Sequence, residues 1–206
     1  GIIIANPNAP TGLLLELNEI EEIIKNNLNN IVIIDEAYID FVGESAIKLI
    51  NKYDNLLVIQ TFSKSRSLAG MRLGFALGNK ELIKGLKNIK FSFNSYTINR
   101  LSILAGIEAF KDEEYFKESV SKIITTREKT KEELKKLGFK VLDSKSNFLF
   151  ISHNKVFAED IYLKLKEKGI LVRYFKQDII KNFIRVTIGT DEEMIIFINA
   201  LKEIIN

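Results

Sequence analysis

The chain has 206 residues, 46% of them hydrophobic and 28% charged, which is the balance of a globular protein with enough apolar side chains for a continuous core. It contains no cysteine, which excludes disulfide frameworks, thiolate metal sites and cysteine nucleophiles. The net charge is only +3 and basic residues are scattered among acidic ones, so we expect no nucleic-acid partner. No apolar run approaches the roughly 20 residues of a membrane-spanning helix, which predicts a cytoplasmic protein without a membrane partner.

The chain opens directly on an apolar segment. Residues 1–5 have the composition of a buried strand, with no initiator Met and no polar lead-in before them. We therefore expect an upstream segment in the native protein, and we expect this sequence to be the C-terminal portion of a longer polypeptide.

Short apolar runs alternate with amphipathic stretches in the first half of the chain. Near-continuous Ile and Val runs are typical of parallel strands that are covered on both faces. Apolar residues from Leu17 to Leu28 have the spacing of one helical face. This order predicts an α/β fold with a mostly parallel sheet. Its four strands are expected at residues 1–5, 31–35, 56–61 and 73–77.

The second half has a different pattern. The region from about residue 96 to 137 is helical and charged, and Gly138 is expected to end it. Strands are then expected at residues 139–142, 147–151, 170–174 and 183–188, with helices at 156–168 and 192–205. We therefore predict part of a large α/β domain at residues 1–111, a connecting helix at 112–136 and a small α+β domain at 137–206.

Polar residues follow three of the predicted strands directly, at the edge where open parallel sheets bind ligands. The first group lies in a turn that two prolines and a glycine make rigid. The residues that could contribute to a site at this edge are Asn8, Asp35, Tyr38, Thr61, Ser63, Lys64 and Arg72.

These residue types together describe a site for pyridoxal phosphate. A carboxylate at a strand end, such as Asp35, needs a cation or a strong donor, and a protonated ring nitrogen is such a partner. Lys64, at the neighbouring strand end, is an amine that can form an imine with an aldehyde. Arg72 and nearby hydroxyls can hold a phosphate. Each residue alone also fits local capping, packing or surface exposure, and only their coincidence favours the cofactor.

The motifs that contain these residues resemble those of a known family. Asn-Pro-Asn-Ala-Pro-Thr-Gly from residue 6, Asp-Glu-Ala-Tyr from 35, Thr-Phe-Ser-Lys from 61 and Gly-Met-Arg from 70 are similar to class-II pyridoxal-phosphate-dependent aminotransferases of fold type I. The resemblance runs through the whole chain, including Arg-Val-Thr-Ile-Gly-Thr from residue 185. It is very specific to this superfamily, within which the chain looks most like the histidinol-phosphate branch, and it is less specific to one substrate.

The resemblance implies roles around the cofactor ring. Lys64 would form the imine with the cofactor and move the proton between the substrate carbon and the cofactor carbon. Asp35 would pair with the ring nitrogen, and Tyr38 would contact the phenolic oxygen of the ring and border the substrate. Many relatives have an asparagine at the position of Ala9 that contacts this oxygen. Either Asn8 takes over the contact here or the contact is lost, and we assign it to Asn8.

The resemblance also implies where anions bind. Thr61, Ser63 and Arg72 would hold the cofactor phosphate. Arg185 would bind the carboxylate of the amino-acid substrate through its fork of donors, and Arg173 would bind another anionic group of the substrate. No metal is expected. The single histidine, His153, is expected to be exposed in a loop because no partners for a catalytic dyad are spaced around it.

The reaction that the resemblance implies is reversible transamination in histidine biosynthesis. L-Histidinol phosphate and 2-oxoglutarate would give imidazole-acetol phosphate and L-glutamate, so the partners are a small amino donor and a 2-oxo acid. A homodimer is implied as well. Alternatives on the same scaffold are a threonine-phosphate decarboxylase-like enzyme and another class I or II aminotransferase. A noncatalytic remnant or a regulatory domain is the alternative outside enzymes.

Overall fold

Apolar runs rich in Ile, Val and Leu form a four-stranded sheet in the first part of the computed structural model, which describes residues 1–205. This sheet belongs to unit 1, which comprises residues 1–8 and 14–119, whereas residues 9–13 and those from Val120 onward form unit 2. The predicted domains 1–111 and 137–206, with a connecting helix at 112–136, stay predictions. Asn206, the last residue of the predicted small domain, lies outside the described residues.

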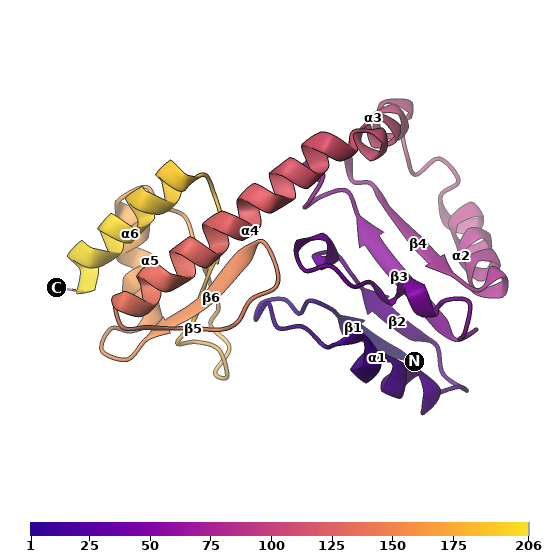
Figure 1. The fold of residues 1–206 in the computed structure, drawn as a ribbon. Helices are drawn as coiled ribbons and strands as arrows, with labels where there is room; N and C mark the ends of the chain where they lie inside the picture. The colour runs from indigo at the N-terminus through magenta and orange to yellow at the C-terminus, as the bar shows by residue number, and fades with distance from the viewer. Residues whose placement is uncertain (206) are drawn as a thin grey trace. The chain divides into compact units, whose positions relative to one another are not determined.

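Unit 1 alternates strands with helices along the chain (Figure 1). Three short 3-10 helices, labelled η, lie in its loops, and α4 (Glu113–Lys136) begins in unit 1 and continues into unit 2. The other elements are β1 (Ile2–Ala5), α1 (Leu17–Lys25), β2 (Val32–Asp35), η1 (Ile39–Phe41), η2 (Ala46–Leu49), β3 (Leu56–Thr61), η3 (Ala69–Met71), β4 (Gly74–Gly78), α2 (Lys80–Phe93) and α3 (Arg100–Lys111).

The strands lie in the order β1-β2-β3-β4, with the first three parallel and β4 antiparallel to β3. This arrangement confirms the predicted α/β fold with a mostly parallel sheet. In the register of the parallel strands, Ala5 pairs with Asp35, and Asp35 pairs with Ile59. The carboxyl ends of β1, β2 and β3 therefore meet at one edge, where ligands bind in open sheets.

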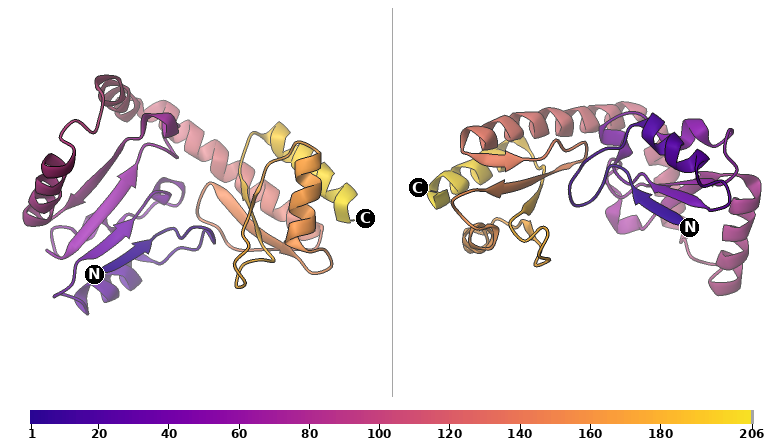
Figure 2. Two further views of the ribbon diagram at one scale, coloured as in Figure 1. Left: turned by 180° about the vertical axis from the view of Figure 1, so that it is seen from behind. Right: turned by 90° about the horizontal axis from the view of Figure 1, so that it is seen from below.

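The core of unit 1 lies on one face of this sheet. Ile20 and Ile24 of α1 are buried against Val32 and Ile34 of β2, and α1 covers this face in both views of Figure 2. On the opposite face Ile3 is 74% exposed. At Ile3 of β1 the predicted coverage of both faces is therefore not found. The consecutive residues Leu56, Leu57 and Val58 of β3 are all buried, so at that strand both faces of the sheet are covered.

Two details of unit 1 differ from the predictions. Helix α1 ends at Lys25, so Leu28 lies beyond it and is exposed. The side-chain amides of Asn26 and Asn27 donate to the carbonyls of Glu22 and Ile23, a competition with the backbone that is typical of helix ends. Helix α2 was not predicted, although the side chain of its N-cap residue Asn79 accepts from Glu81 N at 2.8 Å.

Unit 2 is an α+β structure, as predicted. Its sheet has the order β5-β6-β8-β7 with every neighbouring pair antiparallel. Gly138 follows α4 with φ +83° and ends that helical region, also as predicted. The elements are β5 (Phe139–Val141), β6 (Phe148–His153), α5 (Ala158–Glu167), β7 (Arg173–Tyr174), β8 (Ile184–Thr187) and α6 (Asp191–Ile205).

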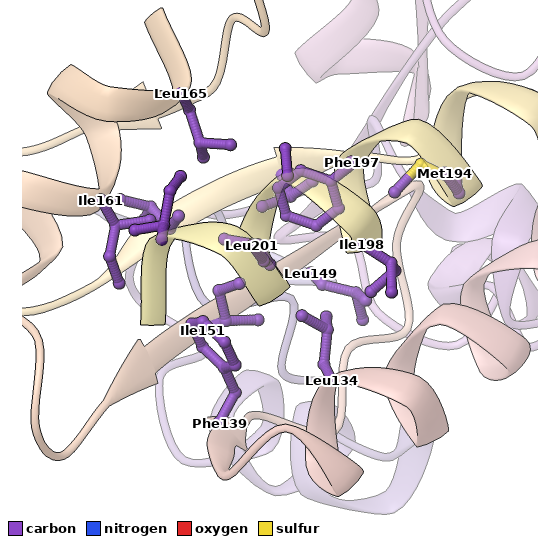
Figure 3. Packing of buried hydrophobic residues seen from close by; sticks show 14 of the residues in the cluster. Leu134, Phe139, Leu149, Ile151, Ile161, Leu165, Met194, Phe197, Ile198 and Leu201 are labelled. Atoms are coloured by element: carbon purple, nitrogen blue, oxygen red, sulfur yellow. The ribbon is translucent and has the colours of Figure 1, made fainter. Parts of the chain in front are cut away.

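The core of unit 2 lies between the sheet and its helices. Figure 3 shows Leu149 and Ile151 of β6 facing Leu134 of α4 and Leu201 of α6, and all four side chains are fully buried. Burial of such side chains stabilises a fold by about 1.5–3 kcal/mol each. Within residues 1–205, none of the helices combines the length and the apolar composition needed to cross a bilayer.

The prediction for His153 was wrong. His153 is the last residue of β6 and is only 8% exposed. The centre of its ring lies 4.8 Å from the centre of the Phe139 ring. Its Nδ1 atom accepts a hydrogen bond from Lys155 N at 3.3 Å. Because β6 extends two residues further than predicted, this histidine is packed in the sheet.

Candidate active site

The candidate site begins where the three parallel strands of unit 1 end. Asn6 N donates to Asp35 O at 2.9 Å, and Glu36 N donates to Ile59 O at 2.8 Å. The hydrogen-bond ladder thus extends one residue beyond β1 and β2. It holds the backbone of the residues after these strands side by side.

The loops after β2 and β3 bring Lys64 close to Tyr38. The Nζ atom of Lys64 lies 5.6 Å from the centre of the Tyr38 ring, within the range of a cation–π contact. Asp35, three residues before Tyr38, ends β2, and its Oδ1 atom accepts from Ala37 N at 3.1 Å. The hydroxyl of Ser65 also donates to the carboxylate of Asp40. These contacts join the Asp35–Asp40 segment to the loop that carries Lys64.

The pairing of β3 with β4 places the backbone of Arg72 beside the end of β3, close in the fold to Thr61 and Ser63. The hydroxyl of Thr61 lies 2.9 Å from the hydroxyl of Ser63 and 3.2 Å from Leu73 O. Phe62 N also donates to Leu73 O, so Arg72, the residue before Leu73, lies beside the end of β3. Arg72 has a left-handed backbone with φ +53°, and its guanidinium donates to Ala69 O at 3.1 Å.

The turn after β1 is held by a residue that the sequence interpretation did not assign. Asn6 is 1% exposed, donates to Leu15 O at 3.0 Å and accepts from Leu15 N at 2.7 Å. These two bonds close the turn across nine residues. Asn8 is half-buried within it, and the Asn6–Pro7 peptide bond is cis. The contact of Asn8 with a cofactor ring stays a prediction.

A buried carboxylate was also missed. Glu36 is 2% exposed and accepts hydrogen bonds from Ser45 Oγ at 2.5 Å, Ala46 N at 2.7 Å and Gln60 Nε2 at 2.8 Å. Burial raises the pKa of Glu36, although these three donors act in the opposite direction. Glu36 therefore fastens the loop after β2 to β3. The Asp-Glu pair at residues 35 and 36 was the available signal, since neighbours at a strand end lie on opposite faces.

Arg173 and Arg185 lie in unit 2, on the neighbouring strands β7 and β8. The guanidinium carbon of Arg185 lies 5.0 Å from the centre of the Phe148 ring. Its Nε atom is buried and has no hydrogen-bond partner within the described residues. A buried donor without a partner is costly, which fits a place where an anionic ligand would complete the bonding.

The structure therefore groups the predicted residues into two sets. Asp35, Tyr38 and Lys64 share one edge of the sheet in unit 1, and the phosphate-binding candidates follow the neighbouring strand end. Arg173 and Arg185 form the second set, in unit 2. Within residues 1–205, Asp35, Lys64 and Arg72 form no ion pair with one another or with other side chains.

These unpaired charges fit pyridoxal phosphate. The cofactor carries an aldehyde for an amine, a ring nitrogen for a carboxylate and a phosphate for a guanidinium, which matches the charges on Lys64, Asp35 and Arg72. The hydroxyls of Thr61 and Ser63 add donors of the kind that bind phosphate oxygens.

Comparison with known proteins also indicates a family of pyridoxal-phosphate-dependent enzymes. A family model described as "Aminotransferase class I and II" matches residues 1–201. The histidinol-phosphate aminotransferase of Brachyspira hyodysenteriae (strain ATCC 49526 / WA1) is 76% identical over 206 residues, which are 100% of this chain and 58% of that protein. The chain thus spans 58% of the length of the curated relative that it matches.

Two solved structures are similar to the whole chain. The crystal structure of the histidinol-phosphate aminotransferase from Clostridium acetobutylicum has a TM-score of 0.90 and 30% identity, covering 99% of this chain and 63% of that one. The crystal structure of the histidinol-phosphate aminotransferase from Sinorhizobium meliloti, in complex with pyridoxal-5'-phosphate, has a TM-score of 0.90 and 27% identity. The match covers 98% of this chain and 56% of that one.

Proposed function

The chain belongs to the aminotransferase class I and II family, and from this premise we propose that its protein transfers an amino group between L-histidinol phosphate and 2-oxoglutarate. The products are imidazole-acetol phosphate and L-glutamate, and the reaction belongs to histidine biosynthesis. The observation that carries the proposal is the Nζ atom of Lys64, 5.6 Å from the Tyr38 ring at the sheet edge where Asp35 ends β2. Identity of 76% to a relative named for this activity supports the choice of substrate.

In this proposal the residues of unit 1 hold pyridoxal phosphate. When bound, the cofactor supplies an electron-withdrawing ring that stabilises negative charge on the substrate carbon. The carboxylate of Asp35 keeps the ring nitrogen protonated, and Tyr38 donates to the phenolic oxygen of the ring. Asn8 is assigned the second contact with that oxygen. Lys64 would bind the cofactor covalently, and its amine would carry the proton between the substrate carbon and the cofactor carbon.

The phosphate of the cofactor is assigned to the end of β3. Thr61 and Ser63 have hydroxyls 2.9 Å apart, and the left-handed backbone of Arg72 follows η3 beside them. Two hydroxyl donors and a guanidinium form a phosphate site of ordinary composition. Since Arg72 donates to Ala69 O at 3.1 Å in this structure, one of its nitrogens is already positioned and the others remain available.

The anionic groups of the substrates are assigned to unit 2. Glutamate and 2-oxoglutarate carry carboxylates beside the reacting carbon, and histidinol phosphate carries a phosphate there. The buried, unsatisfied Nε atom of Arg185 supports its role as the main anion-binding residue. Arg173 is assigned to a second anionic group, and Tyr38 is assigned a contact with the substrate.

The test is labelling followed by a substrate screen with the native-length protein. Borohydride reduction in the presence of pyridoxal phosphate is expected to place a pyridoxyl group on Lys64, which peptide mass spectrometry identifies. A label on another lysine would refute the assignment. Cofactor absorbance is then followed with histidinol phosphate, threonine phosphate, phenylalanine and aspartate, and histidinol phosphate is expected to react fastest. Release of carbon dioxide from threonine phosphate would instead indicate a decarboxylase.

Two further properties are proposed from the family. We expect a homodimer, which light scattering of the purified native-length protein measures directly. We also expect a cytoplasmic location, which fractionation of cells measures. A monomer that retains full activity would remove the dimer from the proposal without affecting the reaction.

A further inference from the structure

Arg66 lies two residues after Lys64 and has no role in the proposed chemistry. Its guanidinium donates to Ala109 O, in the last turn of α3, at 2.5 Å. Its guanidinium carbon lies 4.0 Å from the centre of the Phe116 ring, at the start of α4, and 5.2 Å from that of Phe110. Within the described part of the chain Arg66 forms no ion pair at contact distance, although its charge also acts on the carboxylate of Glu113. Its contacts are therefore with a carbonyl and with aromatic faces.

Helix α3 also supports the other end of the same loop. The hydroxyl of Ser102 donates to Met71 O at 3.0 Å, and Ser102 is 1% exposed. A Cβ atom at Gly106 would lie 2.2 Å from Leu73 Cδ2, so the Leu73 side chain packs directly on α3 at this glycine. Because Ala109 follows on the same helix, α3 contacts the segment after Lys64 at both of its ends.

Residues 62–68, which include Lys64, form a tight turn. Leu68 N donates to Phe62 O at 3.0 Å, and Ser67 N donates to Lys64 O at 3.2 Å. Ser67 has a left-handed backbone with φ +56°. Ser65, next to Lys64, is 3% exposed and donates to Asp40. Lys64 therefore sits in a turn that is fastened to two other elements. Ser65 is bound to Asp40 of η1, and Arg66 is bound to Ala109 of α3.

We propose that Arg66 is a positioning residue for Lys64: its hydrogen bond to Ala109 O and its stacking on Phe116 hold the turn in the orientation that presents the lysine amine to the cofactor aldehyde. The inference rests on the proposed function, because the amine needs placing only if it reacts. Reaction rates are sensitive to such placement, since a shift of about 1 Å in a reacting group can cost roughly 100-fold.

The test compares variants of the native-length protein. Arg66→Leu removes the guanidinium, Phe116→Leu removes its stacking surface while leaving Arg66 in place, and a double variant combines them. Arg66→Lys retains a charge and a donor and serves as the conservative variant. Arg100→Leu removes an exposed arginine from the start of the same supporting helix and is the matched control.

The primary measurement is the rate at which apoprotein and pyridoxal phosphate form the covalent adduct, without substrate, from absorbance and from borohydride quenching. Both single leucine variants are expected to slow this rate about tenfold or more. The double variant should be no slower than the slower single variant, because both changes remove the same support. Arg66→Lys should recover part of the rate, and Arg100→Leu should match the wild type.

Thermal unfolding of the apoproteins separates positioning from a merely structural role. Slower adduct formation at temperatures well below the unfolding of each variant supports the proposal. Wild-type rates in Arg66→Leu and Phe116→Leu would overturn it, and so would independent, multiplying effects in the double variant. If Arg66→Leu does not fold, Phe116→Leu and Arg66→Lys decide alone. Failure of the wild type to label at Lys64 would instead refute the proposed function.

Discussion

Arg173 and Arg185 are direct partners across β7 and β8, with their Cα atoms opposite one another in the antiparallel register. Their guanidinium carbons lie 5.6 Å and 6.0 Å from the centre of one ring, that of Phe175. Like charges opposite each other in a sheet are destabilising. Neither arginine forms an ion pair within residues 1–205, so the pair would gain stability when an anion binds.

Replacing Arg185 is expected to weaken the binding of carboxylate substrates. Arg185→Leu should raise the KM for both glutamate and 2-oxoglutarate by about tenfold or more, because a charged hydrogen-bonding group is lost from the pocket. Arg173→Leu should have a smaller effect, since Arg173 is exposed whereas Arg185 is half-buried. Steady-state kinetics with each substrate in turn measure both changes. Unaltered KM values for glutamate and 2-oxoglutarate in Arg185→Leu would count against the assignment.

Asp35 is expected to act on the chemical step more than on binding. Asp35→Asn keeps an oxygen that can accept from Ala37 N, now at 3.1 Å, but removes the negative charge. We expect carbon deprotonation to slow by roughly 100-fold or more, the usual scale for losing a stabilising charge contact. Substrate affinity should change far less. Single-turnover absorbance and exchange of the substrate hydrogen with deuterium report the step directly.

Asp35→Ala is the companion variant, because it loses both the charge and the hydrogen bond to Ala37. If the charge is what matters, the two variants should be impaired to a similar extent. A large defect in Asp35→Ala with wild-type deprotonation in Asp35→Asn would mean that Asp35 only supports the loop.

Glu36 should make stability depend on pH. Burial raises its pKa in the folded protein above the ordinary value of 4.5. The folded state therefore binds the proton more tightly than the unfolded state. The resulting stabilisation is fully present below pH 4.5 and is lost as the pH rises through the raised pKa.

Comparison with Glu36→Gln isolates this contribution. The free energy of unfolding of each protein is measured by urea denaturation from acid to neutral pH. Because the amide side chain of the variant does not titrate, the stability of the wild type relative to the variant should decrease as the pH rises through that window. If the difference in the free energy of unfolding between the two proteins stays constant, Glu36 does not titrate in this pH range.

Local patterns in the sequence predicted the sheet and its site-bearing edge. The Ile and Leu run of β3 was placed at residues 56–61, as found, because strand composition and the polar residues after it are local signals. Helix α2 was missed even though Leu82, Ile83 and Leu86 have helical spacing after Asn79. The helical signal was therefore present in the sequence, although none of the residues of α2 is buried in the structure.

The supporting contacts of the site could not be predicted in the same way. Arg66 and Ala109 are 43 residues apart, and their bond depends on how α3 folds back on the loop after β3. Ser65 and Asp40 are 25 residues apart. A pattern of residue types indicates that a lysine and a carboxylate lie at one sheet edge. It does not predict which side chains from other elements contact the loops that carry them.

Gly12 offers a test of packing within unit 2. It has φ +75°, and a Cβ atom there would lie 2.2 Å from the Oγ atom of Ser144, a side chain that is fully buried. Gly12→Ala should lower the free energy of unfolding by about 2–4 kcal/mol, from backbone strain and overpacking together. Urea denaturation at neutral pH, followed by circular dichroism, measures the loss.

Gly85→Ala is the matched control. Gly85 lies inside α2, and an added Cβ atom there meets nothing within 4 Å. This change should stabilise the protein by about 0.5–1 kcal/mol, because alanine loses less backbone entropy than glycine in a helix. Ser144 donates to Phe148 O at 2.5 Å, so it cannot turn away from Gly12 without breaking a buried hydrogen bond. Equal stabilities of Gly12→Ala and the wild type would mean that the loop of Ser144 yields without cost.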